Sequence, residues 1–102
     1  MISSRELEQW VERNRARLSR QGITAAFGMT IRVGGRAGVT WISFLSRSAE
    51  GRVVRAADGC CEFDAHRFAD GAVLHDERLA TPTIDDLDAF VLLLGRPAAH
   101  AA

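Results

Sequence analysis

The chain has 102 residues, of which 47% are hydrophobic and 25% charged, and its 13 arginines balance 13 acidic residues. This length holds one domain with one hydrophobic core, and the composition excludes a disordered chain, a collagen-like repeat and a disulfide scaffold. The longest apolar run, residues 89–94, is far shorter than the roughly 20 residues that span a bilayer. The start of the chain carries no apolar signal segment. We therefore expect a cytoplasmic protein with no membrane partner.

Charge is distributed unevenly along the chain. Residues 1–55 contain ten arginines and four acids, whereas residues 56–102 contain three arginines and nine acids. This split predicts a dipolar surface that orients a charged partner, unless the two halves pair with each other and cancel. Four arginines of the first segment spread around a predicted helix, which indicates a solvated helix rather than a nucleic-acid interface. They are Arg13, Arg15, Arg17 and Arg20.

The first predicted element is a helix over residues 4–20. Ser3 and Glu6 have the spacing of a capping box at its start, and Gly22 is placed to end it. One stripe, interrupted by Asn14, carries the apolar residues that should face the core. These are Leu7, Trp10, Val11 and Leu18.

Five strands are predicted after this helix. Residues 23–33 alternate between apolar and small or polar side chains over eleven positions, which is the clearest strand signal in the chain. Four more strands are expected over residues 39–47, 52–57, 60–68 and 72–79, with turns at 34–38, 46–51, 58–59 and 70–71. The last strand is the weakest and is expected at a sheet edge, because it contains His75, Asp76, Glu77 and Arg78 in succession.

The final predicted element is a helix that begins after Thr83. Thr83 is the expected N-cap, and acids in the first turns suit the helix dipole. The apolar stripe consists of Ile84, Leu87, Phe90, Val91 and Leu94. Gly95 and Pro97 end the helix. Residues 1–96 therefore form one predicted domain, and residues 97–102 form a flexible tail.

Together these elements predict an α+β fold in the order α-β-β-β-β-β-α. Strands joined by short loops form an antiparallel meander of four to five strands, and the N-terminal and C-terminal helices pack on one face of it. Trp10 and Trp41 fall in apolar patterns and are expected in the core or half-buried. We expect Trp10 and Phe90 to pack on the part of the face that is built by Phe27, Met29 and Ile31.

The cysteines and histidines are the natural candidates for chemistry. Cys60 and Cys61 are adjacent, so on a strand they point to opposite faces. A bond between them would be strained, so two reduced thiols are expected, one buried and one exposed. His66 and His75 lie near Asp64, Asp70 and Asp76, but no metal-ligand spacing is present and nothing activates a thiol. The sequence therefore predicts no metal site, no cofactor and no catalytic residue.

Acidic residues gather on the predicted hairpin of residues 60–79. Complementary charge speeds association with a basic protein, so we expect a partner-binding surface here; the same acids would also keep an exposed sheet soluble. The predicted partner-binding residues are Asp58, Glu62, Asp64, His66, Asp76 and Glu77, with Arg55 nearby.

Three stretches of the chain carry a resemblance to a known family. They are residues 7–14 leading to Gly22-Ile23, residues 51–54 leading to residues 58–64, and residues 83–90. In order and spacing they are similar to the TriTu family of immunity proteins from bacterial polymorphic toxin systems, over residues 5–94. The resemblance implies a non-enzymatic cytoplasmic protein that binds a cognate toxin domain and blocks its activity. It carries over no catalytic residue and no cofactor.

We therefore expect an immunity protein that is not an enzyme and whose partner is a cognate toxin domain rather than a nucleic acid. Two alternatives stay open. A small dimeric adaptor or secretion-chaperone-like protein would bury an apolar patch in a symmetric homodimer. A small-ligand-binding or enzymatic domain would have a pocket lined by Cys60 or Cys61, His66 and carboxylates.

Overall fold

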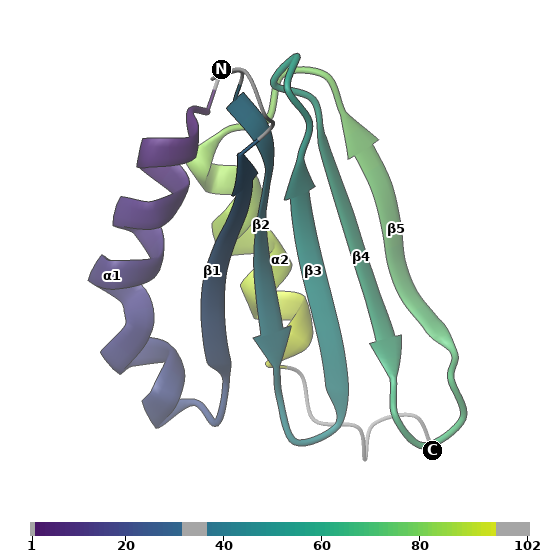
Figure 1. Cartoon of the computed structure of the whole chain (residues 1–102). Helices are drawn as coiled ribbons and strands as arrows, with labels where there is room; N and C mark the ends of the chain where they lie inside the picture. The colour runs from purple at the N-terminus through teal and green to yellow at the C-terminus, as the bar shows by residue number, and fades with distance from the viewer. Residues whose placement is uncertain (1, 32–36, 96–102) are drawn as a thin grey trace.

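A computed structural model describes residues 2–31 and 37–95 of the chain. Its elements are α1 (Ser4–Arg20), β1 (Thr24–Ile31), β2 (Ala37–Leu45), β3 (Ala49–Arg55), β4 (Cys61–Arg67), β5 (Val73–Leu79) and α2 (Ile84–Leu94). The strands form one antiparallel sheet in the order β1-β2-β3-β4-β5 (Figure 1). The predicted α+β fold, a five-stranded meander between two helices, is confirmed.

The bounds of the elements differ from the predictions mainly at two strands. β2 begins at Ala37 rather than at residue 39, and β3 begins at Ala49 rather than at residue 52. Most of the predicted turn at 34–38 and the whole predicted tail at 97–102 lie outside the described residues. Within the described part of the chain, neither helix has the length and apolar character needed to cross a bilayer.

Local hydrogen bonds explain where α1 starts and stops. The Ser3 hydroxyl accepts from the Glu6 amide at 3.1 Å, and the Glu6 carboxylate accepts from the Ser3 amide at 3.2 Å, which completes the predicted capping box. Gly22 follows the helix with a φ of 77°, a left-handed conformation that a side chain would disfavour. At the second helix, the Thr83 amide donates to the Asp86 carboxylate at 2.7 Å.

The core lies between the helices and one face of the sheet. Phe44 of β2 stands at its centre, because its ring is 6.0 Å from that of Trp10 on α1 and 5.8 Å from that of Phe90 on α2. Phe63 of β4 meets Phe90 from the other side, at 5.6 Å. Edge-to-face contacts of this kind add stability beyond the burial of apolar area. Both helices therefore cover the same face of the sheet.

The expected contact of Trp10 and Phe90 with the end of β1 was wrong in its residues, although the face was right. The two rings meet Phe44 and Phe63 on central strands instead. Phe27 packs only at the margin of the core, and Met29 is 47% exposed. Helix α1 runs along β1 and β2, but Trp10 reaches Phe44 on β2, and α2 lies behind β3, where Phe90 contacts both Phe44 and Phe63. The side chain of Ile31 lies outside the described part of the structure.

The oppositely charged halves of the chain interleave on the helical side. Helix α2 passes behind the central strands and comes beside α1 (Figure 1). The Trp10 indole donates to the Asp88 carboxylate at 3.2 Å, and the Arg17 guanidinium lies 4.0 Å from the same carboxylate. The charge split in the sequence is therefore partly neutralised where the two helices meet.

Candidate functional site

No helix of the described part of the chain lies over the second face of the sheet, which we call the open face (Figure 1). Its residues alternate with the core residues along each strand and line up across the strands in three rows. The first row is Gly28, Trp41, Val54, Glu62 and Arg78. The second is Ala26, Ser43, Arg52, Asp64 and Asp76, and the third is Thr24, Leu45, Glu50, His66 and Val73. The open face is therefore uncharged on β1 and β2 and charged on β3 to β5.

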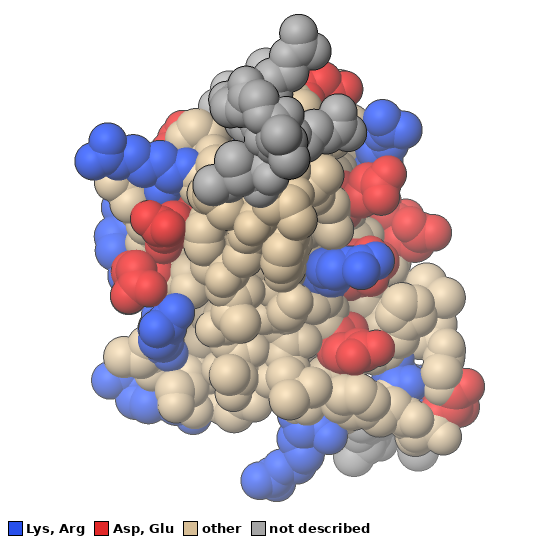
Figure 2. All heavy atoms as spheres, in the orientation of Figure 1, with Lys and Arg blue, Asp and Glu red and all other residues tan. Residues whose placement is uncertain are grey.

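The space-filling view shows the same division. Figure 2 looks onto the open face, and an uncharged surface fills its middle, while acidic and basic side chains gather over β3 to β5 on the right and over α1 on the left. Two apolar side chains contribute directly to the uncharged part, since Leu45 is 53% and Val39 36% exposed. A surface with an apolar part beside a charged part is common at protein interfaces.

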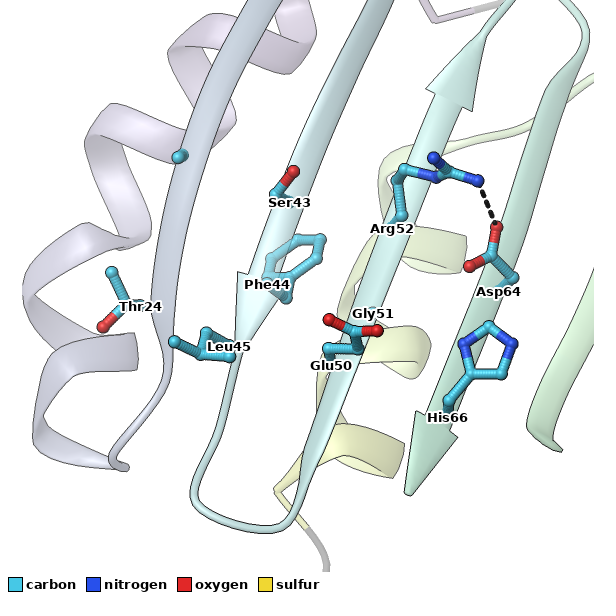
Figure 3. Close-up of a pocket in the computed structure, with 10 residues that line it drawn as sticks. Thr24, Ser43, Phe44, Leu45, Glu50, Gly51, Arg52, Asp64 and His66 are labelled. Atoms are coloured by element: carbon cyan, nitrogen blue, oxygen red, sulfur yellow. Dashed lines mark ion pairs between the residues drawn. The ribbon is translucent and has the colours of Figure 1, made fainter. Parts of the chain in front are cut away.

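The carboxylates of the second row face each other across two strands. Asp64 on β4 stands directly opposite Asp76 on β5. Asp64 also forms an ion pair with Arg52 on β3, with 3.6 Å between guanidinium and carboxylate (Figure 3). Among the described residues, no ion pair engages Asp76 or Glu62, and both are exposed. These two carboxylates are therefore available to a partner.

Arg78 is the one basic residue of β5 on the open face, and its guanidinium interacts electrostatically with Glu62. Arg78 lies directly opposite Glu62, and its Nε donates a hydrogen bond to the sulfur of Cys60 at 3.1 Å. The first row therefore ends on β5 with one basic residue, Arg78, next to the carboxylate of Glu62. The charged part of the open face still has more acids than arginines: Glu50, Glu62, Asp64 and Asp76 against Arg52 and Arg78.

A shallow hollow of about 560 Å³ lies on the lower part of the open face. Its charged and polar lining includes Ser43, Glu50, Arg52, Asp64 and His66, which project from β2, β3 and β4 (Figure 3). Ligand pockets usually bury most of the ligand among apolar walls. Here Glu50, Arg52 and Ser43 are exposed, so the hollow is better suited to a side chain of a protein partner than to an enclosed substrate.

The structure brings together four of the six predicted partner-binding residues. Glu62, Asp64, His66 and Asp76 share the open face. Glu77 does not, because it follows Asp76 directly and therefore points to the helical side, where its carboxylate lies 3.5 Å from the His75 ring.

Asp58 and Arg55, which were also expected at or near this surface, form hydrogen bonds with the backbone elsewhere. Asp58 lies in the turn between β3 and β4, and its carboxylate accepts from the Cys60 amide at 3.0 Å. Arg55 points to the helical side, where its guanidinium donates to the Ile2 carbonyl at 2.9 Å. Arg55 therefore holds the N-terminal segment and does not belong to the open face.

The cysteines and histidines do not form a common site. Cys61 is buried in the core, and burial raises the pKa of its thiol to about 11. Cys60 and His66 share the open face but are six residues apart on an extended chain, which separates them by roughly 20 Å. His75 points to the helical side, where its ring lies 5.7 Å from that of Phe90 at an angle of 59°. No group of His, Cys, Asp and Glu within residues 2–31 and 37–95 has the arrangement of a metal site.

Sequence reasoning missed Trp41, Glu50 and Arg52 as open-face residues. The alternation in β2 does not single out one face, because Val39, Trp41 and Leu45 on one side are as apolar as Ile42 and Phe44 on the other. The observed register of β3 with β4 places Arg52 opposite Asp64 and Glu50 opposite His66. A two-residue turn at 58–59, as predicted, would shift this pairing by one position, so no signal in the sequence identified these two residues.

Comparison of the chain with protein-family models, with curated proteins and with solved structures yields no match.

Proposed function

We propose that the chain is an immunity protein, which binds a cognate bacterial toxin domain through the open face and blocks its activity without catalysis. The observation that carries the proposal is the placement of Asp64 directly opposite Asp76, with Glu62 on the same face. Like charges at opposite cross-strand positions destabilise a sheet. Folding does not favour this arrangement, and its position on an uncovered face supports a role in binding a positively charged partner.

The size of the open face also supports a protein partner. Five strands about 4.8 Å apart and about seven residues long at about 3.3 Å per residue give a footprint of roughly 550 Å² before side-chain relief is added. A standard stable interface takes about 800 Å² of accessible surface from each protein. The open face alone would thus supply about two-thirds of such an interface, and it is much larger than a small ligand needs.

The toxin as partner is supported by the resemblance to TriTu immunity proteins. The stretches that carry it lie in α1, in the β3–β4 hairpin and in the first turns of α2. They hold core and capping residues such as Trp10, Phe63 and Thr83, which define the fold. Most open-face positions lie outside these stretches, but Arg52, Val54, Glu62 and Asp64 lie within them.

A homodimer through the same face is disfavoured by charge. In a face-to-face dimer with two-fold symmetry, β4 and β5 of one copy would cover either the same strands or β1 and β2 of the other copy. The first arrangement brings together strands whose open-face carboxylates, Glu62, Asp64 and Asp76, outnumber their one arginine, Arg78. The second covers these carboxylates with an uncharged surface. A different protein with basic side chains suits the face better.

The test is to co-express the chain with the C-terminal domain of a large secreted protein encoded beside its gene. We expect that domain alone to stop bacterial growth and the chain to restore growth and to form a tight complex with the domain. Asp76→Lys should raise the Kd of this complex at least about tenfold, because it places a positive charge against a basic partner.

Glu77→Lys is the matched control. It makes the same change of charge one residue further along β5 but on the helical side of the sheet, so its Kd should stay within about twofold of the wild-type value. Growth arrest that the chain does not relieve would overturn the proposed function. Equal effects of Asp76→Lys and Glu77→Lys would refute binding through the open face. A stable dimer that ignores the toxin domain would favour the adaptor alternative.

A further inference from the structure

Trp41 is the largest side chain on the open face, and its indole lies over Gly28 of the neighbouring strand. It projects from β2 toward β1, where Gly28 stands directly opposite. A Cβ atom on Gly28 would lie 2.5 Å from both Cε2 and Cζ2 of the indole and 2.8 Å from Nε1. Carbon atoms do not approach this closely, so the ring occupies the space that a side chain at position 28 would need.

This position leaves one side of the indole to solvent. Trp41 is half-buried, whereas Trp10, the other tryptophan of the chain, is 1% exposed. An aromatic ring that is already held in place loses little conformational freedom when a partner covers it. Tryptophans with these properties contribute disproportionately to the affinity of protein complexes.

The surroundings of Trp41 indicate what kind of side chain would cover it. A hollow of about 280 Å³ beside the ring is lined by Val39, Trp41, Ser43, Arg52 and Val54. Val39 and Val54 make it largely apolar, so an apolar or aromatic side chain fits it. On its other flank Val54 stands opposite Glu62, which none of the ion pairs between described residues engages.

We infer that Trp41, held by Gly28, anchors the toxin domain, whose contact surface carries an apolar or aromatic side chain next to a lysine or arginine. The apolar side chain enters the hollow beside the indole, and the basic side chain meets Glu62. The inference rests on the proposed function, since it identifies the central contact of the same interface. It adds that apolar contact at Trp41, rather than the carboxylates alone, provides most of the affinity.

The test compares variants in the complex with the C-terminal toxin domain named above. Trp41→Ala should raise the Kd at least about 30-fold, the change expected for a residue central to an interface. Leu92→Ala is the matched control, because Leu92 is a large apolar side chain, 68% exposed, on the far side of α2. Its Kd should stay within about twofold of the wild-type value. Circular dichroism establishes whether each variant is folded.

A second variant leaves the anchor itself unchanged. Ser43→Arg adds a long basic side chain at the exposed rim of the hollow, next to Arg52, where it blocks the apolar side chain and repels the basic one. Ser43→Arg should raise the Kd as Trp41→Ala does. It therefore still tests the inference if Trp41→Ala does not fold. Wild-type binding that neither variant weakens would overturn the inference and leave the proposed function intact. A wild-type chain that does not bind the domain would overturn the proposed function and the inference with it.

Discussion

The two faces of the sheet are built from alternate residues of the same five strands, yet they meet different demands. On the covered face, Ile42, Phe44 and Phe63 are at most 2% exposed and are fixed by the two helices. On the open face, Asp64 stands opposite Asp76, and folding gains nothing from the pair. Neighbouring residues on one strand therefore differ in role: the first stabilises the fold, and the second belongs to the surface that we propose contacts a partner.

The largest effect on stability is expected when an aromatic ring is removed from the covered face. Phe90→Ala should lower the free energy of unfolding by about 3–5 kcal/mol, because it leaves a cavity between Phe44 and Phe63. Leu92→Ala removes an exposed side chain two residues away on α2 and should cost less than about 0.5 kcal/mol. Urea denaturation measures both. A loss below about 1 kcal/mol for Phe90→Ala would mean that α2 does not seal the core.

The adjacent cysteines allow a second comparison, because they point to opposite faces. Burial raises the pKa of the Cys61 thiol from 9.0 to about 11, so at pH 8 its thiolate fraction is about a hundredth of an ordinary thiol's. Cys60 is only half-buried. Alkylation of the folded protein by iodoacetamide should label Cys60 and spare Cys61, and denaturant should expose both. Mass spectrometry of the Cys60→Ser variant isolates Cys61, whose rapid labelling in the folded protein would contradict its burial.

Two glycines, one on each face of the sheet, allow the space around the two faces to be compared. A Cβ atom on Gly51 would lie 2.9 Å from Phe90 and 3.0 Å from Leu94, beneath α2. Gly51→Ala should therefore cost about 1–3 kcal/mol, because the packed core has no space to yield. Gly28→Ala creates an even closer contact, but with Trp41, whose half-buried ring has open solvent on this face into which the added methyl group can displace it. Thermal unfolding should show a smaller loss of stability for Gly28→Ala than for Gly51→Ala. The reverse order would mean that the open face, and not the covered face, resists an added methyl group more strongly.

Most of the fold could be predicted because its signals are local. The capping box of Ser3 and Glu6 and the apolar stripe of α1 are visible in the sequence, and α1 spans the predicted residues 4–20. The start of β3 was missed because Glu50 and Gly51 resemble a turn. Gly51 is instead a strand residue on which the α2 side chains rest. That contact joins distant parts of the chain, so no local pattern contains it.

The candidate site was predictable only in part. The period of two places Asp76 and Glu77 on opposite faces of β5, so the sequence already indicated that these two residues could not share one surface. The position of Trp41 could not, because β2 is apolar on both sides. Which side the helices cover depends on their tertiary packing, which decides that Phe44 enters the core and Trp41 stays at the surface.

The smallest effect is expected at the turn between β4 and β5, where an exposed ion pair contributes to neither face. The guanidinium of Arg67 lies 2.7 Å from the Asp70 carboxylate, and this contact, followed by the hydrogen bond from the Ala72 amide, lowers the pKa of Asp70 from 3.8 to about 2. The folded state thus binds this proton more weakly than the unfolded state. The pair stabilises the fold above the unfolded pKa, and its contribution is lost as the pH falls toward 2.

Asp70→Asn separates this contribution from the rest of the molecule. The asparagine keeps an oxygen that accepts from the Ala72 amide but carries no charge for Arg67. Urea denaturation should show the variant less stable than the wild type at pH 5, by a small amount because solvent screens an exposed pair. The difference should shrink as the pH falls from 4 toward 2. A difference that stays constant over this range would mean that the substitution acts on the conformation of the turn and not on the charge of the pair.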